Sequence, residues 1–220
     1  MAPLGRLHII TDTRPGRDAL SVAAAALSAG APTIQVRVGD EATDRQAYDF
    51  AGRVRALCDR YRATCLVNDR LHVALAIGAD GAHVGADDLP VDAARRVLGP
   101  QAVLGATARD PDTARAAVAA GASYLGVGPA FATTTKQGLP DALGPAGIGA
   151  VATAVPDTPV IAIGAVTAVR VAPLLTAGAY GVAVIGAVSE AADPAEATRE
   201  LLRALGPGAY EPADTVGSTP

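Results

Sequence analysis

Two aspartates follow neighbouring apolar runs of the sequence in a way that suits metal binding. Asp69 closes the run 64–69, and Asp88 lies shortly after the next run, 82–85. If these runs are adjacent parallel strands, about 4.8 Å apart, both carboxylates can face one cation. Carboxylates without thiols or clustered imidazoles suit a hard ion such as Mg2+, held together with waters and substrate phosphates. The alternative interpretation is that each aspartate caps a helix, because a helical pattern follows both.

A second group of residues suits a polyanionic ligand. Thr133, Thr134 and Thr135 precede Lys136, which is the only lysine of the chain. Hydroxyls, backbone N–H groups and an ammonium together can hold phosphate oxygens, although the spacing does not match a Walker loop. Arg37 ends an earlier apolar run and could grip a phosphate with its forked guanidinium. Its alternative role is that of an exposed ion-pair partner.

Small residues end two later apolar runs. Gly164 and Ala165 belong to one of these runs, and Ile185 and Gly186 belong to the other. In barrel enzymes the last two strands often hold a phosphate through bare backbone N–H groups. Glycine required for tight packing is the alternative, and it explains one such glycine more easily than a pair.

Three more polar residues end apolar runs, and they are Gln35, Asn68 and Thr107. Asn68 is the only asparagine of the chain. No arrangement of serine, histidine and aspartate, or of cysteine and histidine, can be assembled for nucleophilic catalysis. Structural roles are therefore expected for the three histidines, which are His8, His72 and His83.

Eight short apolar runs, typical of strands buried on both faces, must position these residues. They are 8–12, 33–38, 64–69, 82–85, 102–108, 124–129, 159–166 and 181–188. Helical patterns fill the intervals, and the clearest begins at Thr43, which can form a capping box with Gln46. Alternating strands and helices predict an α/β fold, a (β/α)8 TIM barrel built as a single domain from residues 1–205, with its site at the carboxyl ends of the strands. The alternative is an open doubly wound sheet, but no Gly-rich dinucleotide turn follows the first run.

Composition excludes several classes of protein. The chain has 220 residues, of which 50% are hydrophobic, and its net charge of −4 argues against a nucleic-acid or anionic membrane surface. No apolar run is long enough to span a bilayer and no signal peptide is recognised, so we expect a cytoplasmic protein acting on small molecules. Cys58 and Cys65 suit reduced thiols. Residues 206–220 show no periodicity and are expected to form a disordered tail.

The sequence resembles the thiamine phosphate synthase family from His8 to about Leu205. The stretches that carry the resemblance are Val67-Asn68-Asp69-Arg70, residues 78–90 and residues 126–136. Members of this family are (β/α)8 barrels of thiamine biosynthesis, transferases that join hydroxymethylpyrimidine diphosphate to hydroxyethylthiazole phosphate and release pyrophosphate. The resemblance implies Mg2+ as the cofactor, and the sequence is compatible with a homo-oligomer.

The resemblance also implies a role for each candidate residue. Asp69 and Asp88 match the magnesium ligands of the family. Arg37 and Lys136 match the cations that act on the diphosphate, and they are the expected catalytic residues. The remaining expected substrate-binding residues are Gln35, Asn68, Thr107, Thr133, Thr134, Thr135, Gly164, Ala165, Ile185 and Gly186.

Three positions depart from the family pattern. Gly39 stands where the family has a lysine, so one cation on the diphosphate is missing. Ala165 replaces the second glycine of a pair, which is tolerable if its φ is negative, and Gly186 replaces a serine. Two rival functions stay open. One is a thiazole tautomerase-like barrel, in which a histidine would stand at Pro129, and the other is a non-catalytic barrel that binds thiamine precursors, marked by Gly39.

Overall fold

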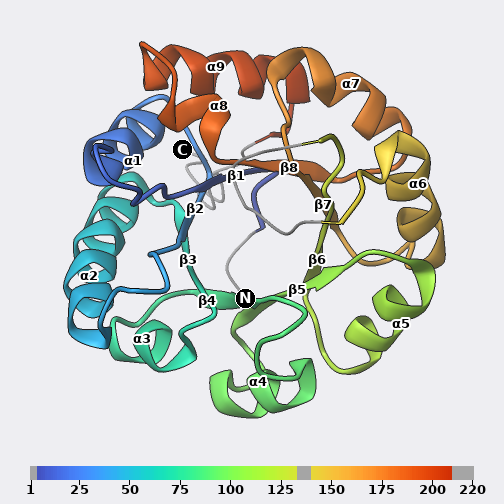
Figure 1. Cartoon of the computed structure of the whole chain (residues 1–220), viewed down its shortest axis with the longest axis horizontal. Helices are drawn as coiled ribbons and strands as arrows, with labels where there is room; N and C mark the ends of the chain where they lie inside the picture. The colour runs from blue at the N-terminus through green and yellow to red at the C-terminus, as the bar shows by residue number, and fades with distance from the viewer. Residues whose placement is uncertain (1–3, 133–139, 210–220) are drawn as a thin grey trace, which may run out of the picture.

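The structure, a computed structural model, describes residues 4–132 and 140–209 as a closed barrel of parallel strands surrounded by helices (Figure 1). The strands are β1 (Leu7–Ile10), β2 (Thr33–Val36), β3 (Thr64–Asn68), β4 (Gly81–Val84), β5 (Val103–Ala108), β6 (Tyr124–Val127), β7 (Val160–Ile163) and β8 (Gly181–Val184). The helices are α1 (Ala19–Ser28), α2 (Asp44–Tyr61), α3 (Leu71–Ala76), α4 (Val91–Leu98), α5 (Pro111–Ala119), α6 (Gly144–Ala154), α7 (Ala168–Thr176), α8 (Gly186–Ser189) and α9 (Pro194–Leu205).

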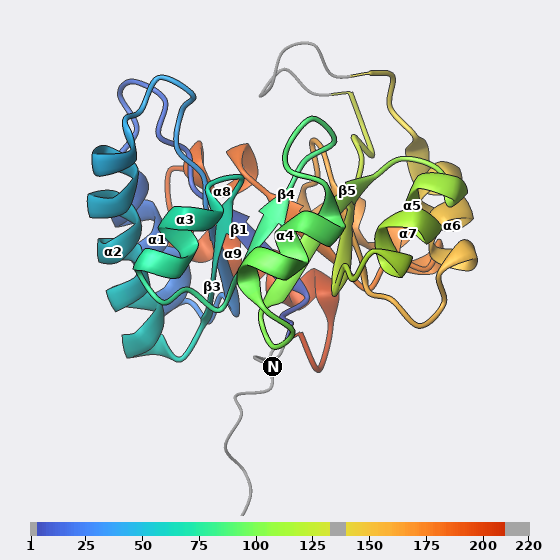
Figure 2. The same ribbon diagram turned by 90° about the horizontal axis from the view of Figure 1, so that it is seen from below.

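Each strand pairs with the next one along the chain, and β8 closes the barrel by pairing with β1. This arrangement confirms the predicted (β/α)8 architecture. Viewed from the side, the loops that follow β1, β2 and β4 rise together at one end of the barrel (Figure 2). All strand carboxyl ends therefore share one rim, where the candidate residues were expected.

The sequence overestimates the length of the last strand. The predicted run 181–188 is strand only as far as Val184, and Gly186–Ser189 form the short helix α8. The ladder to β1 ends where Val184 pairs with Ile9. Beyond that pair the chain leaves the barrel, and its small apolar residues pack equally well in a helical turn. Apolar composition alone does not distinguish a longer strand from a helical turn.

The apolar side chains form two layers of core. The larger cluster lies between the outer faces of the strands and the helices. A smaller cluster fills the inside of the barrel, because alternate residues of each strand point inward. Its buried members are Ile10, Leu66, Val103, Tyr124, Ile161 and Ala183.

Helix α2 forms as its sequence predicts. The Thr43 side chain accepts a hydrogen bond from the Gln46 N–H, and the Gln46 side chain accepts one in return, which completes the capping box. Cys58 on this helix and Cys65 on β3 are buried free thiols. Within 4–132 and 140–209, no helix is long and apolar enough to cross a membrane. The chain continues to Ala209 after α9, and the rest of the predicted tail lies outside the described residues.

Candidate active site at the carboxyl rim of the barrel

Most of the predicted site residues lie at the carboxyl ends of the strands. Arg37 directly follows β2, Asn68 ends β3, and Thr107 belongs to β5. Gly164 directly follows β7, while Ile185 and Gly186 begin α8. The predicted loop Thr133, Thr134, Thr135 and Lys136 lies outside the described residues.

The two candidate metal ligands follow adjacent strands. β3 and β4 pair directly, with Asn68 opposite His83, and the Asp69 N–H donates to the His83 carbonyl at 2.8 Å. One oxygen of the Asp69 carboxylate accepts a 2.5 Å hydrogen bond from the Asn68 side-chain amide. Asp69 also has a φ of 62°, a left-handed conformation that is uncommon outside glycine. The backbone at Asp69, which carries the carboxylate, therefore has a defined left-handed conformation.

The alternative helix-cap interpretation is wrong for both aspartates. The N-cap residues of α3 and α4 are Arg70 and Pro90, and neither helix receives a side-chain cap. Instead, one oxygen of Asp88 accepts a 2.7 Å hydrogen bond from the Gly85 N–H. That bond closes the turn after β4, so Asp88 orients its own loop. Among residues 4–132 and 140–209, no group of three or more His, Cys, Asp or Glu is close enough to hold a metal.

Arg37 is anchored through its backbone. Its N–H donates to the Thr11 hydroxyl at 2.8 Å, and that hydroxyl donates to the Arg37 carbonyl at 2.7 Å. Within the described part of the chain, the Arg37 guanidinium forms no ion pair with a carboxylate, so the ion-pair alternative has no partner there. The guanidinium is thus available to an anionic ligand beside Asn68 and Asp69 on the next strand.

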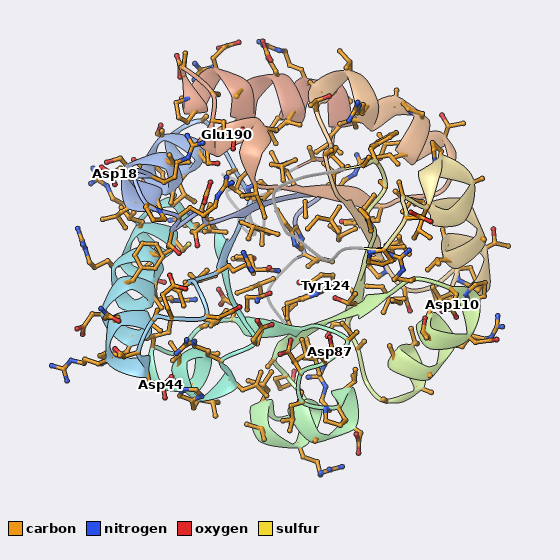
Figure 3. All side chains as sticks on the ribbon, in the orientation of Figure 1. Asp18, Asp44, Asp87, Asp110, Tyr124 and Glu190 are labelled. Carbon is orange, nitrogen blue, oxygen red and sulfur yellow. The ribbon has the colours of Figure 1, made fainter. Side chains whose placement is uncertain are left out.

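A buried polar chain crosses the inside of the barrel below this rim. The Gln35 side-chain amide lies 3.4 Å from the Tyr124 hydroxyl, which lies 3.1 Å from Nδ1 of His83. Nε2 of His83 in turn lies 3.1 Å from the Thr107 hydroxyl. Figure 3 shows Tyr124 inside the ring of strands. Sequence reasoning missed Tyr124, although its inward position follows from strand alternation with Gly126.

Burial sets the protonation of these rings. Desolvation lowers the pKa of His83 to about 4 against an opposing effect of the Asp88 charge, and it lowers the pKa of His8 to about 3. Burial raises the pKa of Tyr124 above its usual range. All three groups are therefore neutral at pH 7. His8 is fully buried among strand residues, whereas the His83 side chain is half-buried.

The small residues after β7 adopt a conformation that the sequence did not predict. Gly164 has a φ of 105°, and a Cβ there would lie 2.6 Å from the Pro129 Cα. Ala165 has a φ of 47°, so the expectation of a negative φ is wrong. Arg170 donates a 2.8 Å hydrogen bond to the Ala165 carbonyl. The Ala165 N–H has no hydrogen-bond partner in 4–132 or 140–209, as a phosphate site requires.

Gly186 has room for a larger side chain. A Cβ built there would lie 3.4 Å from the Glu190 carboxyl group, an ordinary contact. The serine of the family pattern would therefore fit at this position. Glycine at this position supplies no hydroxyl, and the available space does not require glycine.

A cluster of charged residues joins the loop after β1 to α8. The Asp12 side chain is only 2% exposed and binds both Arg14, at 2.6 Å, and the Ser189 hydroxyl, at 2.9 Å. Glu190 completes the cluster through Arg14, at 3.0 Å, and Arg17, at 3.1 Å. Hydrogen bonds from Arg14 hold the pKa of Asp12 at about 2. Sequence reasoning missed this cluster, which fastens the helix that begins at Gly186.

Arg109 holds the two ends of the loop between β6 and α6. Its guanidinium donates to the carbonyl of Gly128 and to the carbonyl of Asp141, both at 2.9 Å. Backbone bonds from Leu143 to Pro129 and from Gly144 to Ala130 add to this closure. The described residues on either side of 133–139 are therefore held together at the rim.

Comparisons with known proteins match the chain to one family. The family model described as thiamine monophosphate synthase matches residues 7–188. A thiamine-phosphate synthase of Salinispora tropica is 70% identical over 207 residues, which cover 93% of this chain and 99% of the relative. A thiamine-phosphate synthase of Salinibacter ruber is 42% identical over 204 residues, covering 92% and 89%.

A solved structure also matches this chain. The thiamine phosphate pyrophosphorylase of Pyrococcus furiosus superimposes with a TM-score of 0.82 at 34% identity, and the match covers 91% of this chain and 95% of that one. The family model spans most of the barrel, and the relatives match nearly end to end. The chain belongs to the thiamine monophosphate synthase family.

Proposed function

We propose that the chain condenses hydroxymethylpyrimidine diphosphate with hydroxyethylthiazole phosphate to give thiamine phosphate and pyrophosphate. The observation that carries this proposal is the grouping of Arg37, Asn68, Asp69 and Asp88 after three consecutive strands, β2 to β4. Family membership and the names of the relatives support the same synthase activity. The chain is thus a transferase acting on small-molecule substrates.

Two separate groups of residues on the rim would suit the two phosphorylated substrates. Arg37 and the two aspartates lie on the side of β2 to β4, and with Mg2+ they would hold the diphosphate. Gly164, Ala165, Ile185 and Gly186 lie on the side of β7 and β8 and would hold the thiazole phosphate through backbone N–H groups. The resemblance alone adds Thr133, Thr134, Thr135 and Lys136 to these sites.

The donor set at β3 and β4 fits Mg2+. Asp69 and Asp88 supply carboxylate oxygens, and a hydrogen bond to one oxygen of each group limits its rotation. Because the described residues bring no third acidic group to this place, substrate phosphate and water would complete the coordination, as is usual for Mg2+. When bound, the ion would neutralise charge on the departing diphosphate.

The protein's own part in the reaction is electrostatic and positional. The bond between the pyrimidine methylene carbon and the diphosphate oxygen breaks, and the diphosphate leaves with the electron pair. Arg37 would stabilise the charge that grows on that group. The thiazole nitrogen, placed by its phosphate, then bonds to the carbon. No protein nucleophile is needed, because proximity and orientation lower the barrier.

The rival functions have less support. A thiazole tautomerase-like barrel would carry a histidine at Pro129, and Pro129 here is packed beside Gly164. A non-catalytic binding protein would bind the same substrates as a synthase. Only the absence of turnover would distinguish the two. A cytoplasmic location and a homo-oligomeric state remain part of the proposal, and membership in a biosynthetic enzyme family supports the location.

One experiment separates the three functions. The purified chain is mixed with both substrates and Mg2+, and pyrophosphate release is followed together with formation of thiamine phosphate. We expect both products in equal amounts, and neither when one substrate is omitted. Isomerisation of a thiazole phosphate without pyrophosphate release would favour the tautomerase. Saturable binding of both substrates without any product would favour the binding protein.

A further inference from the structure

The polar chain inside the barrel is built into the sheet and is not an accidental contact. His83 and Tyr124 lie on β4 and β6, and Gly105 on β5 lies between them in the register. A Cβ at Gly105 would overlap both side chains, and one at Gly126 would lie 2.8 Å from the His83 ring. Two glycines thus open the space in which the rings meet. His8 packs edge-on against Tyr124, with ring centroids 5.2 Å apart.

The donors and acceptors of this chain impose one direction on it. The Gln35 Nε2 group can only donate, so the Tyr124 oxygen accepts from it and points its own hydrogen elsewhere. Among residues 4–132 and 140–209 the other partner of that hydroxyl is Nδ1 of His83, so the Tyr124 hydrogen finds its acceptor there. A neutral imidazole that accepts at Nδ1 carries its hydrogen on Nε2. Nε2 therefore donates to the Thr107 oxygen, 3.1 Å away.

The direction of this hydrogen-bond chain determines what the Thr107 hydroxyl can do. Its oxygen already accepts a hydrogen bond from His83, so its own hydrogen is not needed for the buried chain. Thr107 belongs to the upper end of β5, at the rim where the substrates are proposed to bind. The hydroxyl can therefore donate to a ligand oxygen, and it cannot easily turn away.

We propose that Tyr124 is a positioning residue that fixes His83 as its Nε2–H tautomer and thereby presents the Thr107 hydroxyl as a hydrogen-bond donor to the diphosphate. The inference rests on the proposed function for the identity of the ligand, but the tautomer is a property of the free protein. Tyr124 touches no substrate in this account, because it lies 1% exposed inside the barrel. It acts through His83.

The tautomer can be measured directly. The protein is labelled with 15N-histidine, and the ring nitrogens are observed by NMR, with the His83 signals identified by their loss in His83→Gln. We expect His83 to show a protonated Nε2 and an unprotonated, hydrogen-bonded Nδ1. In Tyr124→Phe the Nδ1 signal should shift as its donor disappears, and the second tautomer should become populated. The exposed tyrosine on α2 offers a matched control, since Tyr48→Phe should leave the ring signals unchanged.

Two results would overturn the proposal. A protonated Nδ1 in the unmodified protein would mean that the chain runs the other way, with Thr107 donating to His83. Unchanged His83 signals in Tyr124→Phe would mean that the tyrosine does not select the tautomer. If Tyr124→Phe does not fold, Thr107→Val provides the second test, because it should move the Nε2 signal and leave Nδ1 unprotonated. A hydrogen on Nδ1 in Thr107→Val would contradict the proposal as well.

Kinetics supply an independent test. Tyr124→Phe should lower kcat by about threefold to tenfold, the effect of one misplaced hydrogen bond, with little change in the KM of the thiazole substrate. In a Thr107→Val background the same change should cost nothing more, because both act through one hydroxyl. If the losses in kcat of the two single variants multiply in the double variant, Tyr124 acts by a route other than the Thr107 hydroxyl. An unmodified protein without synthase activity would refute the proposed function, while the NMR result would still decide the tautomer.

Discussion

The carbonyl oxygen of Ala165 accepts a 2.8 Å hydrogen bond from the guanidinium of Arg170, five residues further along the chain. The same guanidinium lies 4.7 Å from the centre of the Phe131 ring. Arg170 therefore joins the loop after β7 to the loop after β6. It does so while Ala165 keeps a φ of 47°, which costs an L-residue about 1 kcal/mol.

The strain at Ala165 predicts a stabilising substitution. Ala165→Gly should raise the free energy of unfolding by about 0.5 kcal/mol, because relief of the left-handed strain exceeds the extra chain entropy of glycine. Urea denaturation measures the difference. Ala172→Gly on the exposed side of α7 is the matched control and should lower the same quantity by about 1 kcal/mol. Destabilisation of equal size by both variants would mean that Ala165 is not strained.

Gly39 predicts a gain of substrate affinity when the family's lysine is restored. A Cβ at Gly39 would overlap the carboxylate of Glu41, a flexible side chain that can move. That carboxylate would also pair with the new ammonium and weaken its effect on the diphosphate. We expect Gly39→Lys to lower the KM of the pyrimidine diphosphate slightly, and Gly39→Lys with Glu41→Gln to lower it further. Glu41→Gln alone serves as the control, and an equal KM in all variants would place residue 39 away from the ligand.

The carboxylates of Asp69 and Asp88 predict that the rate depends on Mg2+. The neighbouring Asp87 should have no part in this dependence. Asp69→Asn and Asp88→Asn should each lower kcat by about 100-fold or more and raise the Mg2+ concentration needed for half-maximal rate. Asp87→Asn, at the exposed position beside Asp88, should leave both quantities unchanged (Figure 3). Rates measured over a Mg2+ titration test this. A normal Mg2+ profile in Asp69→Asn would remove that residue from the metal site.

The charged cluster at α8 predicts a pH-dependent contribution to stability. Arg14 lowers the pKa of Asp12 from 3.8 to about 2, so the folded protein binds fewer protons than the unfolded chain between these values. The contribution is therefore complete above about pH 4 and is lost as the pH falls through about 2. Asp12→Asn should lower the free energy of unfolding by about 2 kcal/mol at pH 7, and less and less below pH 4.

Urea denaturation at several pH values measures this difference. The matched control is Asp157→Asn, because Asp157 is exposed at a turn. It should unfold like the unmodified protein at each pH. A constant difference for Asp12→Asn between pH 7 and pH 2 would contradict the assigned cause.

The sequence by itself determined the barrel and most of the rim. Eight buried strands alternating with helices have few ways to pack, and the barrel places the carboxyl end of every strand at one edge. Arg37, Asn68 and Asp69 could therefore be assigned to one neighbourhood before any contact was known. The capping box of Thr43 and Gln46 was equally predictable, because it depends on residues three apart.

Only the tertiary structure decided the contacts that depend on register and on closure. Tyr124 meets His83 because β4, β5 and β6 align their residues with Gly105 between the rings. Asp12 meets Ser189 because β1 closes against β8, which brings together residues 177 apart in the chain. The φ of Ala165 and the early end of β8 follow from the path of the chain beyond the ladder. A local apolar pattern carries no information about such partners, because it records which residues are buried and not which atoms they face.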